Sequence, residues 1–182
     1  MRSTLLTGLL ALVLAAAASA ATSDTTGVTV DVNSGPAVSV TGSSSPTFAL
    51  TLNGVDQTTS YTLPLVVTDA TGSGNGWNLT ITSTTFVSGS NTFPTTASTI
   101  TGVTSGCASG STCLLPTNSV SDSNLAVPAG TTAPSAVKFY NATSSTGRGT
   151  IDVNATVQVA VPANVLAGSY ASTLTVASVS GP

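Results

Sequence analysis

The stretch from Ile151 to Val161 alternates apolar and polar side chains without a break. Its apolar residues occupy positions 151, 153, 155, 157, 159 and 161, so all six fall on the same side of an extended chain. A period of two is the pattern of a β-strand with one buried face. Six inward positions in a row predict a central strand of a sheet.

Similar but shorter patterns recur along the chain, separated by glycine, proline and asparagine turn signals. They predict further strands at 27–32, 37–41, 48–52, 61–67, 77–83, 136–140 and 170–179. After residue 20 there is no helical spacing of useful length. Strands joined by turns without helices predict one all-β domain, an antiparallel β-sandwich of the Ig-like, Greek-key type.

Two regions of this pattern are irregular. Pro64 lies inside a predicted strand and indicates an edge or a bulge, because proline has no N–H to donate to a ladder. Residues 87–135 contain several prolines and only short apolar pieces. A loop of that length is improbable in a compact domain, so short strands or an elaborated crossover are expected there. The sequence does not place them.

The first twenty residues have the features of a signal peptide. A basic start at Met1–Arg2 precedes an apolar run at 5–17 and a small-residue cleavage site at 18–20. The run is too short for a membrane-spanning helix, so no membrane insertion is predicted. We expect residues 1–20 to be removed and residues 21–182 to fold as a single domain at the cell surface or outside the cell.

Charge is scarce, with 3 cationic and 6 acidic residues among 182 and no histidine. So few cations argue against nucleic acid as a partner. Without histidine, neither a Ser-His-Asp nor a Cys-His arrangement can be built, and the aspartates are dispersed. The sequence therefore predicts a protein that is not an enzyme and that needs neither a cofactor nor a metal.

Cys107 and Cys113 are the two cysteines of the chain. In an exported protein, neighbouring cysteines indicate a disulfide that closes a small loop. A metal pair and a redox dithiol are the alternatives. A metal site would need further cysteine or histidine ligands, which this chain lacks.

The only tryptophan, Trp77, follows a glycine-rich loop at 72–76 and opens an alternating stretch. It shares one side with Leu79 and Ile81, and the opposite side, which begins with Asn78, is predicted to face solvent. An indole ring can stack on a sugar, or it can be a core residue. The alternation favours the core. Asp69, at the start of the loop, is predicted to accept hydrogen bonds from loop amides.

The stretch from Val67 to Leu79, with Trp77-Asn78-Leu79 as a W-x-L motif, resembles the first signature of the WxL domain of bacterial cell-surface proteins. Residues 161–176 are similar to the end of that domain, although Val176-Ala177-Ser178 stands where members usually carry a second W-x-L. The resemblance implies a secreted β-sandwich attached non-covalently to cell-wall peptidoglycan or to other surface proteins. It also implies that Trp77, Asn78 and Leu79 take part in that attachment.

A second hypothesis comes from the surface composition and the start of the mature chain. Low charge, threonine-rich faces and a predicted strand at 27–32 behind a polar lead-in are compatible with a structural subunit of an extracellular filament or coat. Such a subunit would self-assemble by adding this strand to the sheet of a neighbour.

Overall fold

The structure, a computed structural model, describes residues 28–42 and 45–182. The predicted signal peptide lies outside the described residues. The chain divides into two units, Met1–Val32 and Asn33–Pro182, which are considered separately below. No helix occurs in the described ranges, and therefore none that could cross a lipid bilayer. The strands are antiparallel apart from one short parallel pair, which confirms the predicted all-β, sandwich-like fold.

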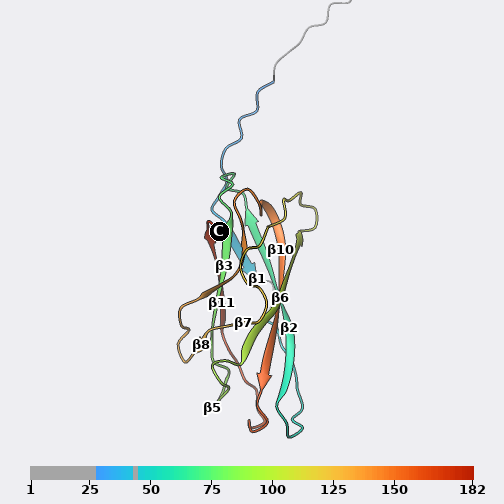
Figure 1. The fold of residues 1–182 in the computed structure, drawn as a ribbon, viewed down its shortest axis with the longest axis vertical. Coiled ribbons are helices and arrows are strands. Elements are labelled where there is room, and N and C mark those ends of the chain that lie inside the picture. Colours follow the sequence, from blue (N-terminus) through green and yellow to red (C-terminus); the bar gives the residue numbers. More distant parts are fainter. Residues whose placement is uncertain (1–27, 43–44) are drawn as a thin grey trace, which may run out of the picture. The chain divides into compact units, whose positions relative to one another are not determined.

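The larger sheet of the 33–182 unit has five strands in the order β1–β2–β10–β6–β7, all antiparallel (Figure 1). Its strands are β1 (Ser39–Gly42), β2 (Gln57–Asp69), β10 (Gly149–Val161), β6 (Ser98–Cys107) and β7 (Leu125–Ala126). The predicted central strand is central, because β10 lies between β2 and β6. It is in register with β2 over its whole length, from Gly149 opposite Asp69 to Val161 opposite Gln57.

The second sheet is built around one strand. β3 pairs with β11 along one edge and with β8 and β9 along the other. These strands are β3 (Trp77–Thr84), β11 (Leu174–Ser180), β8 (Ala129–Gly130) and β9 (Val137–Ala142). A two-stranded hairpin of β4 (Val87–Ser88) and β5 (Asn91–Thr92) completes the fold.

The core lies between the inner faces of the two sheets. The inward residues of β10 are buried at every second position, as the alternation predicts. They meet inward residues of β2, β3 and β9. The largest fully buried side chains of this core are Trp77, Phe139, Leu79, Ile81, Ile100, Ile151, Val67 and Val127.

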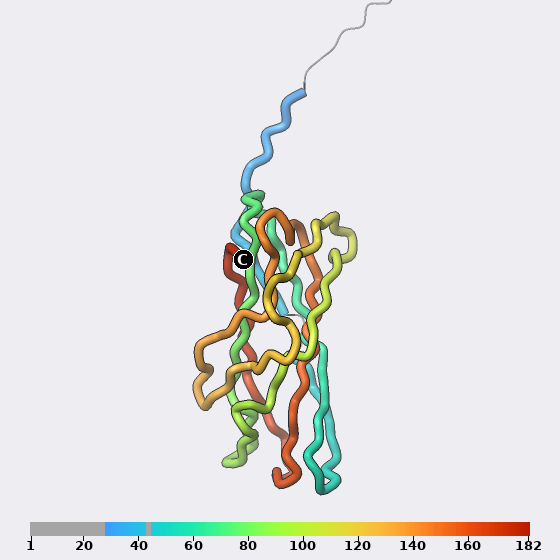
Figure 2. The backbone as a smooth tube through the Cα atoms, viewed as in Figure 1, coloured from blue at the N-terminus to red at the C-terminus, as the bar shows by residue number. Residues whose placement is uncertain are grey.

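The glycine-rich loop takes the chain from one sheet to the other. It joins β2 to β3, so this connection is a corner of the sandwich and not a hairpin; it is the green loop at the upper end of the strands in Figure 2. Gly72, Gly74 and Gly76 all have positive φ angles, which glycine adopts without steric cost. Asp69 accepts hydrogen bonds from the Thr71 N–H at 3.0 Å and the Thr71 hydroxyl at 2.7 Å, as predicted.

Two predicted strands do not form ladders. Residues 48–52 and the described part of 27–32, residues 28–32, are extended but belong to no strand, and no turn occurs at 33–36. Phe48 stacks on Tyr61 with ring centroids 5.8 Å apart. The alternation at 48–52 therefore reflects the packing of side chains on one side of this segment, while its backbone joins no ladder. The last predicted strand begins at Leu174 and not at Tyr170.

Pro64 lies at a partial edge of the large sheet. β1 pairs with β2 only from Leu65 to Thr68, so at Pro64 the β1 side of β2 has no ladder. The predicted edge is therefore present locally, although β2 as a whole lies between two strands. Proline is tolerated at such a position because a backbone donor is not required there.

The irregular region 87–135 contains one long strand that the sequence did not indicate. β6 has ten residues but alternates poorly, because only its first residues are buried. Cys107, its last residue, forms a disulfide with Cys113, which confirms the predicted pairing. The disulfide closes the loop that follows β6.

Burial of Tyr61 predicts a loss of stability at high pH. Desolvation raises the pKa of the Tyr61 phenol above its ordinary value of 10.0. Above about pH 10 the unfolded chain therefore loses a proton that the folded chain keeps, and the free energy of unfolding falls as pH rises. Urea unfolding at about pH 8 and about pH 11 should show a smaller fall for Tyr61→Phe than for the unaltered protein. Equal falls would contradict this assignment.

Candidate functional site

The indole of Trp77 is a core group. Its side chain is 0% exposed, and its ring is tilted against that of Tyr140, with centroids 6.2 Å apart. The indole Nε1–H donates a 2.7 Å hydrogen bond to the backbone carbonyl of Gly147. Both the apolar surface and the donor of the ring are thus used inside the protein, so the core interpretation of Trp77 is correct.

The other two residues of the W-x-L motif are also buried. Leu79 is 0% exposed, and Asn78, which was predicted to face solvent, is 7% exposed. The Asn78 side-chain amide donates to the Gly181 carbonyl at 2.8 Å, which holds the end of the chain against β3. As folded, the three side chains offer almost no surface to a ligand. Trp77, Asn78 and Leu79 therefore have a structural role in the fold, and the wall contact predicted through them stays a prediction.

The described residues show no cluster of metal-binding side chains. No group of three or more Cys, Asp or Glu side chains could hold a metal ion within the described ranges. Because the two cysteines form the disulfide, no thiol is left to act as a nucleophile or a ligand. A candidate site must therefore be sought among apolar surfaces and strand edges.

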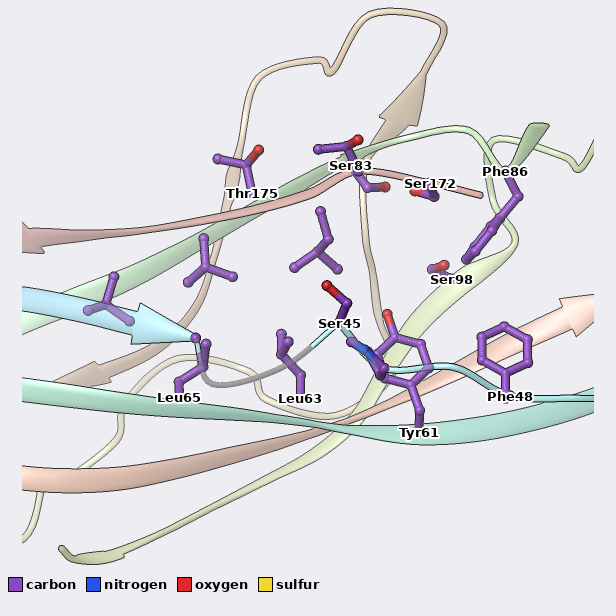
Figure 3. A pocket seen from close by; sticks show the side chains of 16 residues that line it. Ser45, Phe48, Tyr61, Leu63, Leu65, Ser83, Phe86, Ser98, Ser172 and Thr175 are labelled. Carbon is purple, nitrogen blue, oxygen red and sulfur yellow. The ribbon is translucent and has the colours of Figure 1, made fainter. Parts of the chain in front are cut away.

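A groove of about 890 Å³ opens between the two sheets of the 33–182 unit. One wall is the inner face of β1 and β2, and the opposite wall includes β11 and the end of β3. In Figure 3, Tyr61, Leu63 and Leu65 rise from β2 toward the second sheet. Phe86 approaches from the other side.

The lining of this groove is uncharged and mixes apolar with polar side chains. Leu63, Leu65, Leu174 and Val176 contribute aliphatic surface. The hydroxyl-bearing lining residues are Ser45, Tyr61, Ser83, Ser98, Ser172, Thr173 and Thr175, and no charged residue contributes. Such a surface suits an uncharged occupant.

A strand edge borders the groove. β11 pairs with β3 from Leu174 to Ser180, and no strand of the described chain pairs with its other edge. Near one end of β11, the Ser178 hydroxyl donates to the Val38 carbonyl at 3.2 Å. From Leu174 to Ala177 the backbone is therefore available for a further strand beside the groove.

Residues 28–32 carry the most exposed large apolar side chains of the described protein. Val28, Val30 and Val32 are 85%, 76% and 90% exposed, and they alternate with Thr29 and Asp31. Scattered exposed valines are common, but three in alternation form the pattern of a half-buried strand. In the described structure residues 28–32 belong to no strand.

The sequence signalled only part of this candidate site. The alternation correctly placed Leu174 and Val176 on an inward face. It could not show that the sheets remain apart there, because the width of a gap depends on segments distant in sequence. A continuous β-pattern at 27–32 was the one visible signal, and it was interpreted as a strand within the domain.

Comparisons with known proteins identify no relative of this chain, because no protein-family model, no curated protein and no solved structure matches it.

Proposed function

We propose that this protein is a non-catalytic, extracellular structural subunit that associates with copies of itself by β-strand addition. Residues 28–32 act as the added strand. The observation that supports this best is the exposed, alternating segment Val28–Val32, which has the pattern of a strand but no ladder. Strand addition combines main-chain hydrogen bonds with pockets for alternate side chains.

The energetic argument is one of burial. Fully burying a valine side chain contributes about 1.5–3 kcal/mol, so three valines represent a substantial driving force for association. The segment carries a single charge, Asp31, on the side opposite the valines. That side remains in water when the valines are buried, so association does not require burial of the carboxylate.

Wall attachment is the rival function. The resemblance to WxL domains supports it, but the contact it implied is buried, so a different surface would have to bind peptidoglycan. Nothing in the geometry of the described residues selects such a surface. Strand addition is preferred because it uses an observed, exposed feature.

Deleting residues 21–32 from the exported form, residues 21–182, should abolish self-association. Val30→Asp should weaken it at least about tenfold, because a carboxylate would replace a side chain that is buried on association. Sedimentation velocity over a range of protein concentrations measures both effects. The matched control is Val55→Asp, because Val55 is 59% exposed and lies outside the segment.

Two results would count against the proposal. One is an unaltered protein that remains monomeric at all concentrations, and the other is association that survives the deletion. Pelleting with purified cell-wall sacculi by a protein that otherwise stays monomeric would support wall attachment instead. Trp77 fluorescence of the deletion variant checks that the domain remains folded, since this indole lies in the core.

A further inference from the structure

We infer that the acceptor for residues 28–32 is the free edge of β11, together with the groove beside it, in a second copy of this chain. This inference rests on the proposed function and goes beyond it by naming the receiving surface. Three properties of the described residues support it: an unpaired backbone, a matching side-chain pattern and a neutral lining.

The backbone of β11 can accept a strand. Its ladder is with β3 alone, so one row of its N–H and C=O groups has no strand partner. The five residues 28–32, when extended, span about 17 Å at roughly 3.3–3.4 Å per residue. β11 has seven residues, and its edge is available from Leu174 to Ala177, so the added strand can pair along that part of β11.

The side chains of the donor fit the groove. A strand beside β11 directs every second residue to the face on which Leu174 and Val176 lie. Val28, Val30 and Val32 would then enter the groove on the side of Leu174 and Val176. Thr29 and Asp31 would face outward, so the acidic group stays in water. The groove carries no charge that the valines would have to desolvate.

The other strand edges are less suitable. Residues 45–52 run beside β2, where Phe48 already packs on Tyr61 (Figure 3). At the opposite end of the large sheet, β7 is only two residues long. No residue of β7 lines the groove between the sheets. β1 also has an edge without a strand partner and lines this groove, but it contributes only Val40 as an apolar side chain, whereas β11 contributes Leu174 and Val176.

A second copy is the proposed occupant because every copy carries both the exposed segment 28–32 and the free edge of β11. Since each copy then presents one donor and one acceptor, the contact is head-to-tail and can repeat into a filament.

Cross-linking between two variants that each add one cysteine to the native Cys107–Cys113 disulfide tests the acceptor. One variant carries Val30→Cys. The other carries Val176→Cys and a longer tag, so that a mixed dimer can be recognised by its size. Adjacent strands lie about 4.7–4.9 Å apart, within the Cα separation that a disulfide allows. We expect at least about tenfold more mixed disulfide dimer on mild oxidation than with the control Ala126→Cys. Ala126 is exposed on β7, which lies at the edge of the large sheet opposite to β1.

The outcomes separate failure of the acceptor from failure of the proposed function. Association that depends on residues 28–32, but with equal cross-linking at 126 and 176, would overturn the β11 acceptor and leave the function standing. Absence of both association and cross-links would overturn both. A disulfide that forms only inside a chain carrying both cysteines would show closure within one chain. Trp77 fluorescence verifies that each variant is folded.

Discussion

Replacing Trp77 with alanine is expected to cost about 4–8 kcal/mol of unfolding free energy. The indole is fully buried, and deleting a buried tryptophan side chain usually costs about 3–5 kcal/mol through lost transfer energy and the cavity left behind. The change also leaves the Gly147 carbonyl without its donor, which adds a penalty of about 1–3 kcal/mol.

Urea unfolding followed by circular dichroism measures this effect, because the variant has no tryptophan to observe. A suitable control is Leu166→Ala, since Leu166 is 63% exposed and its loss should change stability by no more than about 0.5 kcal/mol. A Trp77→Ala protein as stable as the control would refute the structural role of the indole. Domains of this size are stable by only about 5–15 kcal/mol, so loss of wall binding in this variant would report unfolding.

Gly147→Ala is expected to destabilise the protein by about 2–5 kcal/mol. Gly147 has a φ of 67°, and a side chain in the left-handed region costs about 1–2 kcal/mol. Its added Cβ would overlap the Cβ of Ala142 and lie 2.7 Å from the Nε1 of Trp77. Overpacking of this kind costs a further amount of about 1–3 kcal/mol. The change should also lengthen the hydrogen bond from Trp77.

Gly74→Ala is the matched control for this substitution. Gly74 has a φ of 68°, almost the same as that of Gly147, but its added Cβ would meet no atom within 4 Å. The difference between the two variants therefore isolates the close packing from the backbone strain. Urea unfolding monitored by Trp77 fluorescence measures both. Equal destabilisation would mean that the tight contact beside the indole does not contribute.

The alternating stretches account for most of the fold that could be predicted. Where a strand is buried on one face along its whole length, as from Ile151 to Val161, side-chain period and backbone pairing coincide. At 48–52 the period is present without a ladder, because Phe48 packs on one face while its backbone has no neighbour. The ten residues of β6 were missed for the opposite reason: pairing exists, but only a few side chains are buried.

The candidate site was less predictable than the fold. Val28, Val30 and Val32 were visible as a strand pattern, but sequence cannot tell a strand that pairs within its own domain from one that awaits a partner. Trp77 illustrates the converse. A motif predicted to bind proved to be internal, because the Gly147 carbonyl, seventy residues away, receives the indole N–H.

By itself the sequence determined the class of the protein: an all-β chain without the residues for histidine-dependent catalysis and with a small disulfide loop. These properties depend on composition and on the local period of two, which the backbone geometry of a strand imposes. Only the tertiary structure decided which strands are neighbours, that the indole of Trp77 is fully buried, and where the two sheets stay apart. Those features depend on contacts between residues distant in sequence, such as Leu63 and Val176 across the groove, and no local pattern encodes the distance between them.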